Sequence, residues 1–594
     1  MSRDQRRRDR IAQWAFDTRP VLGRFHLWLA DVETRRVSGP DAEGPESFVG
    51  GALERAFVTA TAVTALGTRL FGRYGEGVGL DQAALNRVKK DSDAISAYAL
   101  SEGLWYLTRN LPENHAVMVC LGEGLMPKAG EAPEMGSNPL LGFGRVYARP
   151  EVARFLDRRV HRLLNDASYG WNDFWREVEE HGVTVWGAAV DTLECTKRFA
   201  QGETSGPMTL LHLFDQPLRV TCPYEGYVGT LMLPREVVER AALDSRLLTY
   251  RTPRRMVLEE IRRAFPDVEP ERVHVWTLGG PQRRPRLGDL WNEWSQLGAH
   301  VVENGWTIPG GGAVFTDSGT YAPVFRVGAF RDGEGRRHVF LIDGYAASAE
   351  AIQAASLDPI LGTSTSMTLF SSQFKAPHHR EAGVMQLDTE ADDFDARLAA
   401  HLGRDVGEDV ARAYRDSIRA ARDADMPGHK PFVAIDDFLP KKSWRLLALS
   451  GFMLPDPYSG APGVEKVDDG IYRVTVRAAT QRRIDEVTLT LRLMESPDES
   501  RLVFSPLLDR FYATRGKREY RERAVKVSDS GRIRNELQTL CLEALDFPGN
   551  DRIRVDLSRV DDAVLPADKK QLIREVLAWY KEHHPIWFWW LELA

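Results

Sequence analysis

The sequence has few cysteines, and their spacing excludes the common cysteine-based sites. Cys120, Cys195, Cys222 and Cys541 are scattered along 594 residues, and none forms a Cys-x-x-Cys pair. This argues against a zinc knuckle or a redox dithiol. So few cysteines in so long a chain favour a reducing compartment, and we expect a cytoplasmic protein. Cys120 lies in an apolar run and is expected to be a small core residue.

Several short catalytic and nucleotide-binding motifs are also missing. The sequence has no Gly-x-x-x-x-Gly-Lys-Ser/Thr loop, and no Gly-x-Gly-x-x-Gly pattern opens a helix after a predicted strand. It has neither a His-Glu-x-x-His zinc helix nor a Gly-x-Ser-x-Gly nucleophile elbow. These absences exclude the standard forms of several enzyme classes, but they do not exclude an enzyme.

Long apolar runs and a strong basic excess are absent too. No stretch of about 18 uncharged apolar residues occurs, so we expect no membrane span. The formal net charge of −7 argues against a surface devoted to nucleic acid. The basic segment at residues 2–10 is expected to be a solvated terminus, and Asp17, Arg19 and Pro20 interrupt the segment after it, which argues against a secretory signal. A hydrophobic content of 43% fits a soluble globular protein with a large core.

Alternation of helical and strand patterns predicts an α/β protein. We expect a mixed, mostly three-layer α/β core with a helical N-terminal region and a smaller α+β C-terminal region. A helix is expected to begin at Pro150, and Gly182 is placed to end a helix before a strand. The predicted regions are a helical segment (1–112), the α/β core (113–390), a charged helical connector (391–430) and an α+β segment with an aromatic tail (431–594).

Two neighbouring stretches predict turns between strands. "APVFRVGAF" and "RRHVFLIDGY" flank "RDGEGR", which is typical of a β-hairpin. Upstream, "IPGGGAVF" (308–315) fits a tight turn, because glycine readily adopts a positive φ. We expect these glycines to form a hinge or turn that presents the polar side chains after them.

Two candidate sites combine glycines with basic side chains. "CLGEGLMPKAG" follows a predicted strand, where Gly122 and Gly124 would let backbone amides approach an anion and Lys128 would add a charge. Arg283 and Arg284 follow a glycine pair and precede a predicted helix, which suits phosphate or carboxylate binding. A plain strand-to-loop turn and a solvated basic loop are the respective alternatives.

A third candidate joins the glycine turn to a downstream carboxylate. Its predicted substrate-binding residues are Gly311, Gly312, Asp317, Ser318, Thr320 and Tyr321. Asp343 is expected to end a strand, where a carboxylate can act as a general base. Asp317 and Asp343 are also candidate metal ligands, since divalent cations prefer oxygen donors. The alternative for Asp343 is a turn residue or a helix N-cap.

A fourth candidate is the loop "SSQFKAPHHRE". His378 or His379 could transfer protons near neutral pH, and Lys375 and Arg380 could hold an anion. If the strands around them are neighbours, Lys375 and the histidines would meet Asp343 in one pocket as catalytic groups. A solvated loop is the alternative, and the spacing does not suit zinc.

The sequence therefore favours an enzyme of small-molecule metabolism that uses acid–base chemistry on a phosphate- or carboxylate-bearing substrate. The reaction would be of lyase, isomerase or hydrolase type, and a divalent metal is a candidate cofactor. The alternative is a non-catalytic binding or assembly protein whose glycine loops are structural turns. We expect a small anion as partner, no nucleic acid, and a homo-oligomer in which the tail "HHPIWFWWLELA" packs within or between subunits.

Overall fold

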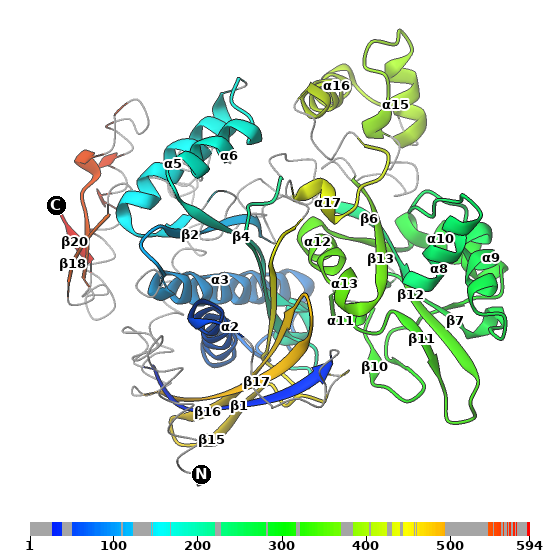
Figure 1. Cartoon of the computed structure of the whole chain (residues 1–594), viewed down its shortest axis with the longest axis horizontal. Coiled ribbons are helices and arrows are strands. Elements are labelled where there is room, and N and C mark those ends of the chain that lie inside the picture. Colours follow the sequence, from blue (N-terminus) through cyan, green and yellow to red (C-terminus); the bar gives the residue numbers. More distant parts are fainter. Residues whose placement is uncertain are drawn as a thin grey trace.

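The structure is a computed structural model, and it covers most of the chain. It describes residues 27–38, 50–107, 111–122, 144, 146–166, 168–219, 227–280, 283–316, 321–369, 384–402, 405–423, 430–439, 443–456, 458, 460–493, 545–549, 552–559, 562, 567, 570–571, 574–575, 578 and 591–594. Within these residues the fold is mixed α/β, with two large mixed sheets packed against helices, as the sequence predicts (Figure 1).

Among the described residues, the first sheet has nine strands drawn from three distant parts of the chain. Eight of them follow the order β1 (Leu27–Ser38), β17 (Ile484–Leu493), β16 (Ile471–Thr480), β14 (Leu446–Phe452), β5 (Met208–Phe214), β4 (Thr184–Glu194), β2 (His115–Gly122) and β3 (Val146–Ala148), and β15 (Val464–Asp468) pairs with β16. Apolar and polar residues alternate in "DGIYRVTVRAATQRRIDEVTLTLRLME", which predicts an antiparallel pair of strands, and the β16–β17 pair confirms it. The sheet joins strands from three of the four predicted regions.

Strand β1 differs from the helical character expected of the first 112 residues. Leu27, Leu29 and Val32 are buried, the residues after Val32 are largely charged, and a bulge interrupts the pairing with β17 between Leu29 and Asp31. An edge strand with one solvated face buries few apolar side chains, so its sequence signal is weak. The helical character expected of this region is found in α2 (Ala52–Phe71) and α3 (Gln82–Leu107).

The two faces of this sheet belong to different cores. Val190, Leu211 and Leu449 pack on the face covered by α2 and α3. Side chains alternate along a strand, so the neighbouring residues Ala189 and Leu210 point to the opposite face. They belong to the core shared with the second sheet. β4 and β5 therefore lie between two layers, and polar side chains on their second face are buried.

In the part of the chain that the structure describes, the second sheet has six strands. Five follow the order β13 (Thr363–Leu369), β6 (Tyr227–Pro234), β12 (Arg337–Ala347), β7 (Val273–Trp276) and β8 (His300–Val301), and β11 (Gly328–Arg331) pairs with β12. The β11–β12 pair confirms the predicted hairpin. Its helices include α8 (Arg235–Leu243), α9 (Arg254–Ala264), α10 (Arg284–Gln296) and α12 (Ser348–Ser356). Helix α12 contacts both β4 of the first sheet and strands of the second, so it joins the two layers (Figure 1).

The glycine-rich stretch forms a turn between two short strands, β9 (Trp306–Thr307) and β10 (Ala313–Val314). Gly310 has φ +74, which confirms the prediction of a turn that needs glycine. The expected strand "APVFRVGAF" does not begin with its first apolar residues, because residues 321–324 form the short helix α11 (Tyr321–Val324). A four-residue apolar run has no clear period, so it cannot distinguish the two structures.

The remaining elements flank the two sheets. Pro150 is the first residue of α5, and Gly182 with φ +62 separates α6 from β4, as predicted. The predicted charged connector contains α15 and α16. None of the helices among the described residues has the length and apolar character needed to cross a membrane. The elements are α5 (Pro150–Asn165), α6 (Trp171–Glu180), α7 (Thr196–Ala200), α13 (Asp358–Leu361), α15 (Phe394–Leu402), α16 (Glu408–Asp423), α17 (Ile435–Phe438), β18 (Leu545–Gly549), β19 (Arg552–Val555) and β20 (Leu591–Leu593).

Candidate metal centre

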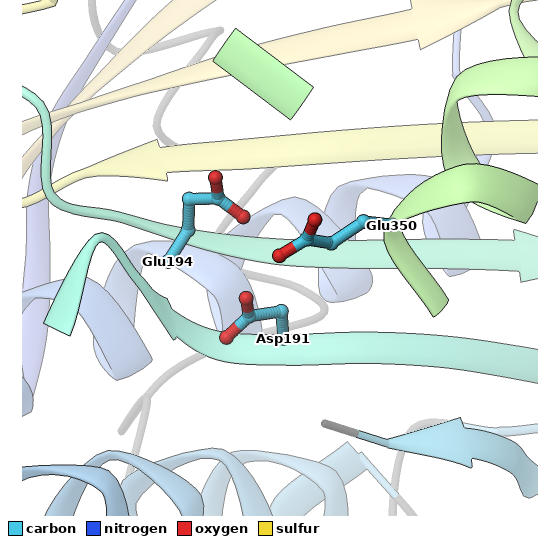
Figure 2. A group of neighbouring side chains, drawn as sticks. All are labelled: Asp191, Glu194 and Glu350. Atoms are coloured by element: carbon cyan, nitrogen blue, oxygen red, sulfur yellow. The ribbon is translucent and has the colours of Figure 1, made fainter. Parts of the chain in front are cut away.

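Three acidic side chains meet between β4 and α12. Asp191 and Glu194 come from β4, Glu350 comes from the first turn of α12, and their carboxylates point toward one another (Figure 2). One oxygen from each lies within 4.8 Å of the others. Two oxygens bound to one ion at about 2.4 Å can be no more than about 4.8 Å apart, so the spacing fits one divalent cation. The three residues are only 3%, 1% and 6% exposed.

A bulge in β4 places Asp191 and Glu194 on the same side. In a regular strand, residues three apart point to opposite faces. Here the pairing of β4 with β5 shifts register between Asp191 and Glu194. The next residue, Cys195, has φ +65, a left-handed conformation that costs a non-glycine residue roughly 1–3 kcal/mol. Bulges and such strained residues are frequent beside functional sites, because they re-aim side chains.

Helix α12 turns a polar stripe toward β4 and β5. Glu350, Gln353 and Ser356 lie on one helical face, since residues three apart are neighbours, and all three are buried. Gln353 Nε2 donates to the Ala189 carbonyl at 3.0 Å, and Ser356 Oγ lies 3.1 Å from Nδ1 of His212. Burial lowers the pKa of His212 to about 3, so this imidazole is neutral. The stripe fixes α12 over the strand that carries Asp191.

Gln353 also carries a buried oxygen that the fold leaves unused. Its side chain is fully buried, and Oε1 has no hydrogen-bond partner among the described residues. Leaving such an acceptor unsatisfied costs about 1–3 kcal/mol. Gln353 lies one turn after Glu350 on α12. Its hydrogen bond to the carbonyl of Ala189 holds it at β4, two residues before Asp191. An amide oxygen in this position is a further donor for a hard cation.

A tyrosine lies near Glu194 of the acidic cluster, and an arginine contacts that tyrosine. The hydroxyl of Tyr458 is buried and has no hydrogen-bond partner among the described residues. Burial, followed by the electrostatic influence of Asp456, Cys195 and Glu194, raises the pKa of Tyr458, so the phenol stays neutral. Arg326 donates to the Tyr458 carbonyl, and its guanidinium carbon lies 5.4 Å from the centre of the Tyr458 ring.

The glycine turn lies beside Arg326. A Cβ atom added to Gly311 would lie 3.6 Å from the Arg326 guanidinium carbon. The same hairpin continues to Phe315, whose ring lies 3.5 Å below the guanidinium of Arg198 on α7. Arg198 is buried, and its Nε donates to the Ser205 carbonyl at 3.2 Å. Two guanidinium groups therefore border the hairpin on the side of α7 and Tyr458.

Asp343 lies in the middle of β12, whereas the sequence places it at the end of a strand. It is fully buried and accepts from Arg254 Nε at 2.7 Å and Nη2 at 2.6 Å, and from Trp294 Nε1 at 2.7 Å. Burial alone would lower the pKa of Arg254, but the charge of Asp343 and its hydrogen bonds raise it. These contacts are typical of a structural ion pair, while the catalytic and metal-binding roles stay predictions.

The other predicted residues are spread over the fold. Gly122 ends β2, Arg283 and Arg284 lie at the start of α10, Tyr321 begins α11, and Gly311 and Gly312 lie in the β9–β10 turn. Among them, Gly122 lies nearest the acidic cluster, because it pairs with Val190, the residue before Asp191 on β4, while Gly311 approaches Arg326. The remaining candidates lie outside the described residues: Gly124, Lys128, Asp317, Ser318, Thr320, Lys375, His378, His379 and Arg380. The predicted meeting of Asp343 with Lys375 and the histidines is therefore untested.

Sequence reasoning missed the acidic cluster for a physical reason. Asp191 and Glu194 lie in a strand, where regular geometry separates them, and Glu350 lies far away in the sequence. The one available signal was a pair of carboxylates inside an otherwise apolar strand, since charged residues are rarely fully buried. A scan against known protein-family models finds no match for this chain, and no curated protein is significantly similar to it.

Proposed function

We propose that the protein is a divalent-metal-dependent enzyme that acts on an anionic small molecule. The observation that carries the proposal is the convergence of three buried carboxylates, Asp191, Glu194 and Glu350, within the span of one ion. Carboxylates removed from water cannot all be ionised side by side without compensating positive charge. A bound cation would contribute positive charge there and would take all three carboxylates as ligands.

The donor set favours a hard cation. All the candidate ligands are oxygens, namely the three carboxylates and the amide oxygen of Gln353. Oxygen ligands suit Mg²⁺, Mn²⁺ and Ca²⁺, whereas zinc sites are dominated by histidine and cysteine. The nearby thiol of Cys195 does not belong to this donor set, since its Sγ lies 3.9 Å from Glu194 Oε1 as a weak hydrogen-bond donor. We therefore favour Mg²⁺ or Mn²⁺ over zinc.

The neighbouring groups suit an anion and a proton donor. Arg198, which also pairs with Glu203 at 3.4 Å, and Arg326 border the β9–β10 hairpin, and guanidinium groups bind phosphate or carboxylate in a bidentate manner. Tyr458 keeps its proton because its pKa is raised, so its hydroxyl can donate to a substrate oxygen. When bound, the metal would polarise a substrate oxygen or activate water. The reaction type is still the lyase, isomerase or hydrolase type expected from the sequence.

The test is the response of stability to metal. Adding Mn²⁺ or Mg²⁺ to the metal-free protein should raise its unfolding temperature. At a metal concentration of about 100 times Kd, the free energy of unfolding should rise by about 2.7 kcal/mol. Asp191→Asn should abolish this response. It should also stabilise the metal-free protein, because it removes one of three clustered negative charges. This opposite pair of effects separates a metal site from simple damage to the core.

The matched control is Glu260→Gln. Glu260 is also fully buried, but it pairs with Arg246 at 2.6 Å and Arg263 at 2.8 Å. This variant should lose stability and keep the full response to metal. If Mn²⁺, Mg²⁺ and Ca²⁺ all leave the wild-type unfolding temperature unchanged, the carboxyl groups share protons and the proposal fails.

A further inference from the structure

A second buried polar cluster lies on the other sheet and is independent of the acidic one. His300 on β8, His274 on β7 and His338 on β12 form a chain that ends at Asp332, in the turn between β11 and β12. His300 Nδ1 lies 2.9 Å from His274 Nδ1, His274 Nε2 lies 2.8 Å from His338 Nδ1, and His338 Nε2 lies 3.1 Å from Asp332 Oδ2. His274 is 4% exposed and His338 is 7% exposed, while His300 is half-buried.

Parallel strand pairing holds the histidines on one face. His274 is opposite His300 in the β7–β8 pair and opposite Phe340 in the β7–β12 pair. His338 lies two residues before Phe340, so it shares the face of Phe340. The positions of the rings therefore follow from the register of three adjacent strands.

The chemistry of the end group fixes the direction of the hydrogen bonds. An ionised carboxylate only accepts, so His338 donates to Asp332 through Nε2–H. The other nitrogen of a neutral imidazole accepts, so His338 Nδ1 accepts from His274 Nε2–H. By the same argument, His274 Nδ1 accepts from His300 Nδ1–H, which leaves Nε2 of His300 as a free base.

We propose that these four side chains form a proton relay, in which a proton taken up at His300 Nε2 appears as positive charge on His338 beside Asp332. His300 gains a proton at Nε2 and passes its Nδ1 proton to Nδ1 of His274. His274 passes its Nε2 proton to Nδ1 of His338, which then holds two protons. One proton enters, no other reactant is needed, and each histidine–histidine hydrogen bond re-forms with donor and acceptor exchanged.

The surroundings favour charge at the Asp332 end of the chain. Burial, and then the neighbouring His300 and His338, lower the pKa of His274 to about 3, so the middle ring passes a proton but does not keep it. Desolvation would raise the pKa of Asp332, but hydrogen bonds from His338 and Arg336 lower it, so the carboxylate stays ionised. An ionised carboxylate in contact with His338 stabilises an imidazolium there.

Other groups around the chain leave this direction unchanged. Burial lowers the pKa of His300, and Glu303 opposes this shift. Arg336 also pairs with Glu334 at 3.2 Å, which offsets part of its positive charge near Asp332. Trp306 and Phe330 line the chain without charge, with ring centres 4.5 Å from His274 and 5.4 Å from His338.

The geometry fits a proton better than a metal ion. His274 uses a different ring nitrogen toward each neighbour, so one ion cannot bind all three histidines in this arrangement. Two nitrogens bound to a tetrahedral ion at about 2.0–2.1 Å would lie roughly 3.3 Å apart. The separations of 2.9 and 2.8 Å are those of hydrogen bonds.

The test is a titration of ring-labelled histidines in the full-length protein by NMR, with His300→Gln and His338→Gln used for assignment. As the pH falls, His300 should change from the Nδ1–H to the Nε2–H tautomer without gaining charge. His338 should become an imidazolium at the same midpoint. Asp332→Asn should lower this shared midpoint by about one pH unit or more, because it removes the ionised partner.

Asp267→Asn is the matched control. Asp267 is a carboxylate near the same strands that pairs with Arg337 at 2.7 Å and Arg331 at 2.9 Å, outside the histidine chain, so its loss should leave the midpoint unchanged. The wild-type titration is decisive even if Asp332→Asn fails to fold. The relay is refuted if His300 itself becomes doubly protonated, if its midpoint differs from that of His338, or if added Zn²⁺ binds stoichiometrically to the three rings.

Discussion

Replacing Asp343 by asparagine should destabilise the protein strongly, because the change leaves a buried charge without its partner. Asp343 is fully buried and accepts three hydrogen bonds, two from Arg254 and one from Trp294. The amide group of asparagine would turn two donor hydrogens toward donors on Arg254 or Trp294. Breaking a buried ion pair by removing one partner costs about 3–5 kcal/mol. We expect Asp343→Asn to lose a free energy of unfolding of this size.

The assay is urea unfolding at neutral pH, followed by tryptophan fluorescence and circular dichroism. Asp244→Asn is the control, because Asp244 is 39% exposed in its pairs with Arg240 and Arg263 and such surface pairs contribute about 0–1 kcal/mol. If Asp343→Asn unfolds at the same urea concentration as the wild type, the ion pair does not have this structural role. Loss of a catalytic activity with stability unchanged would instead support the role predicted from the sequence.

Two further changes test the fold away from the proposed sites. Burial raises the pKa of Asp358 from 3.8 to about 6, so its contribution to stability is full below pH 3.8 and is lost as the pH rises through about 6. Asp358→Asn should therefore flatten the decline of unfolding free energy between about pH 4 and 7, and an unchanged pH profile would contradict the assignment. Gly187→Ala should cost about 1–3 kcal/mol or more, because the added Cβ would lie 2.2 Å from the Gln216 carbonyl oxygen, a backbone atom. Gly333→Ala meets no atom within 4 Å and should stay within about 0.5 kcal/mol of the wild type in the same denaturation assay, so equal effects of the two changes would refute the close approach.

The sequence was informative where local signals agreed. Pro150 suits the first turn of a helix, and α5 begins there. The alternating residues of β16 and β17 predicted an antiparallel pair, and the glycine stretch predicted the β9–β10 turn. Each of these elements depends on short-range chemistry, namely proline geometry, period-two alternation or a positive φ.

The rest depends on contacts between distant segments. β1 joins the first sheet by pairing with β17, and the sequence of β1 alone does not show this partner. The acidic cluster needs the bulge after Asp191, the polar face of α12 and the packing of that helix on β4. Asp343 looked like an end-of-strand carboxylate because "DG" is typical of turns, yet β12 continues through Gly344 to pair with β6.

Anomalous diffraction at the manganese edge, from crystals grown in Mn²⁺, tests the metal site most directly. We predict one strong peak about 2.0–2.6 Å from oxygens of Asp191, Glu194 and Glu350. The peak should be lost in Asp191→Asn and retained in Glu260→Gln. Well-ordered carboxyl groups in direct contact with one another, with no anomalous peak between them, would contradict the metal site.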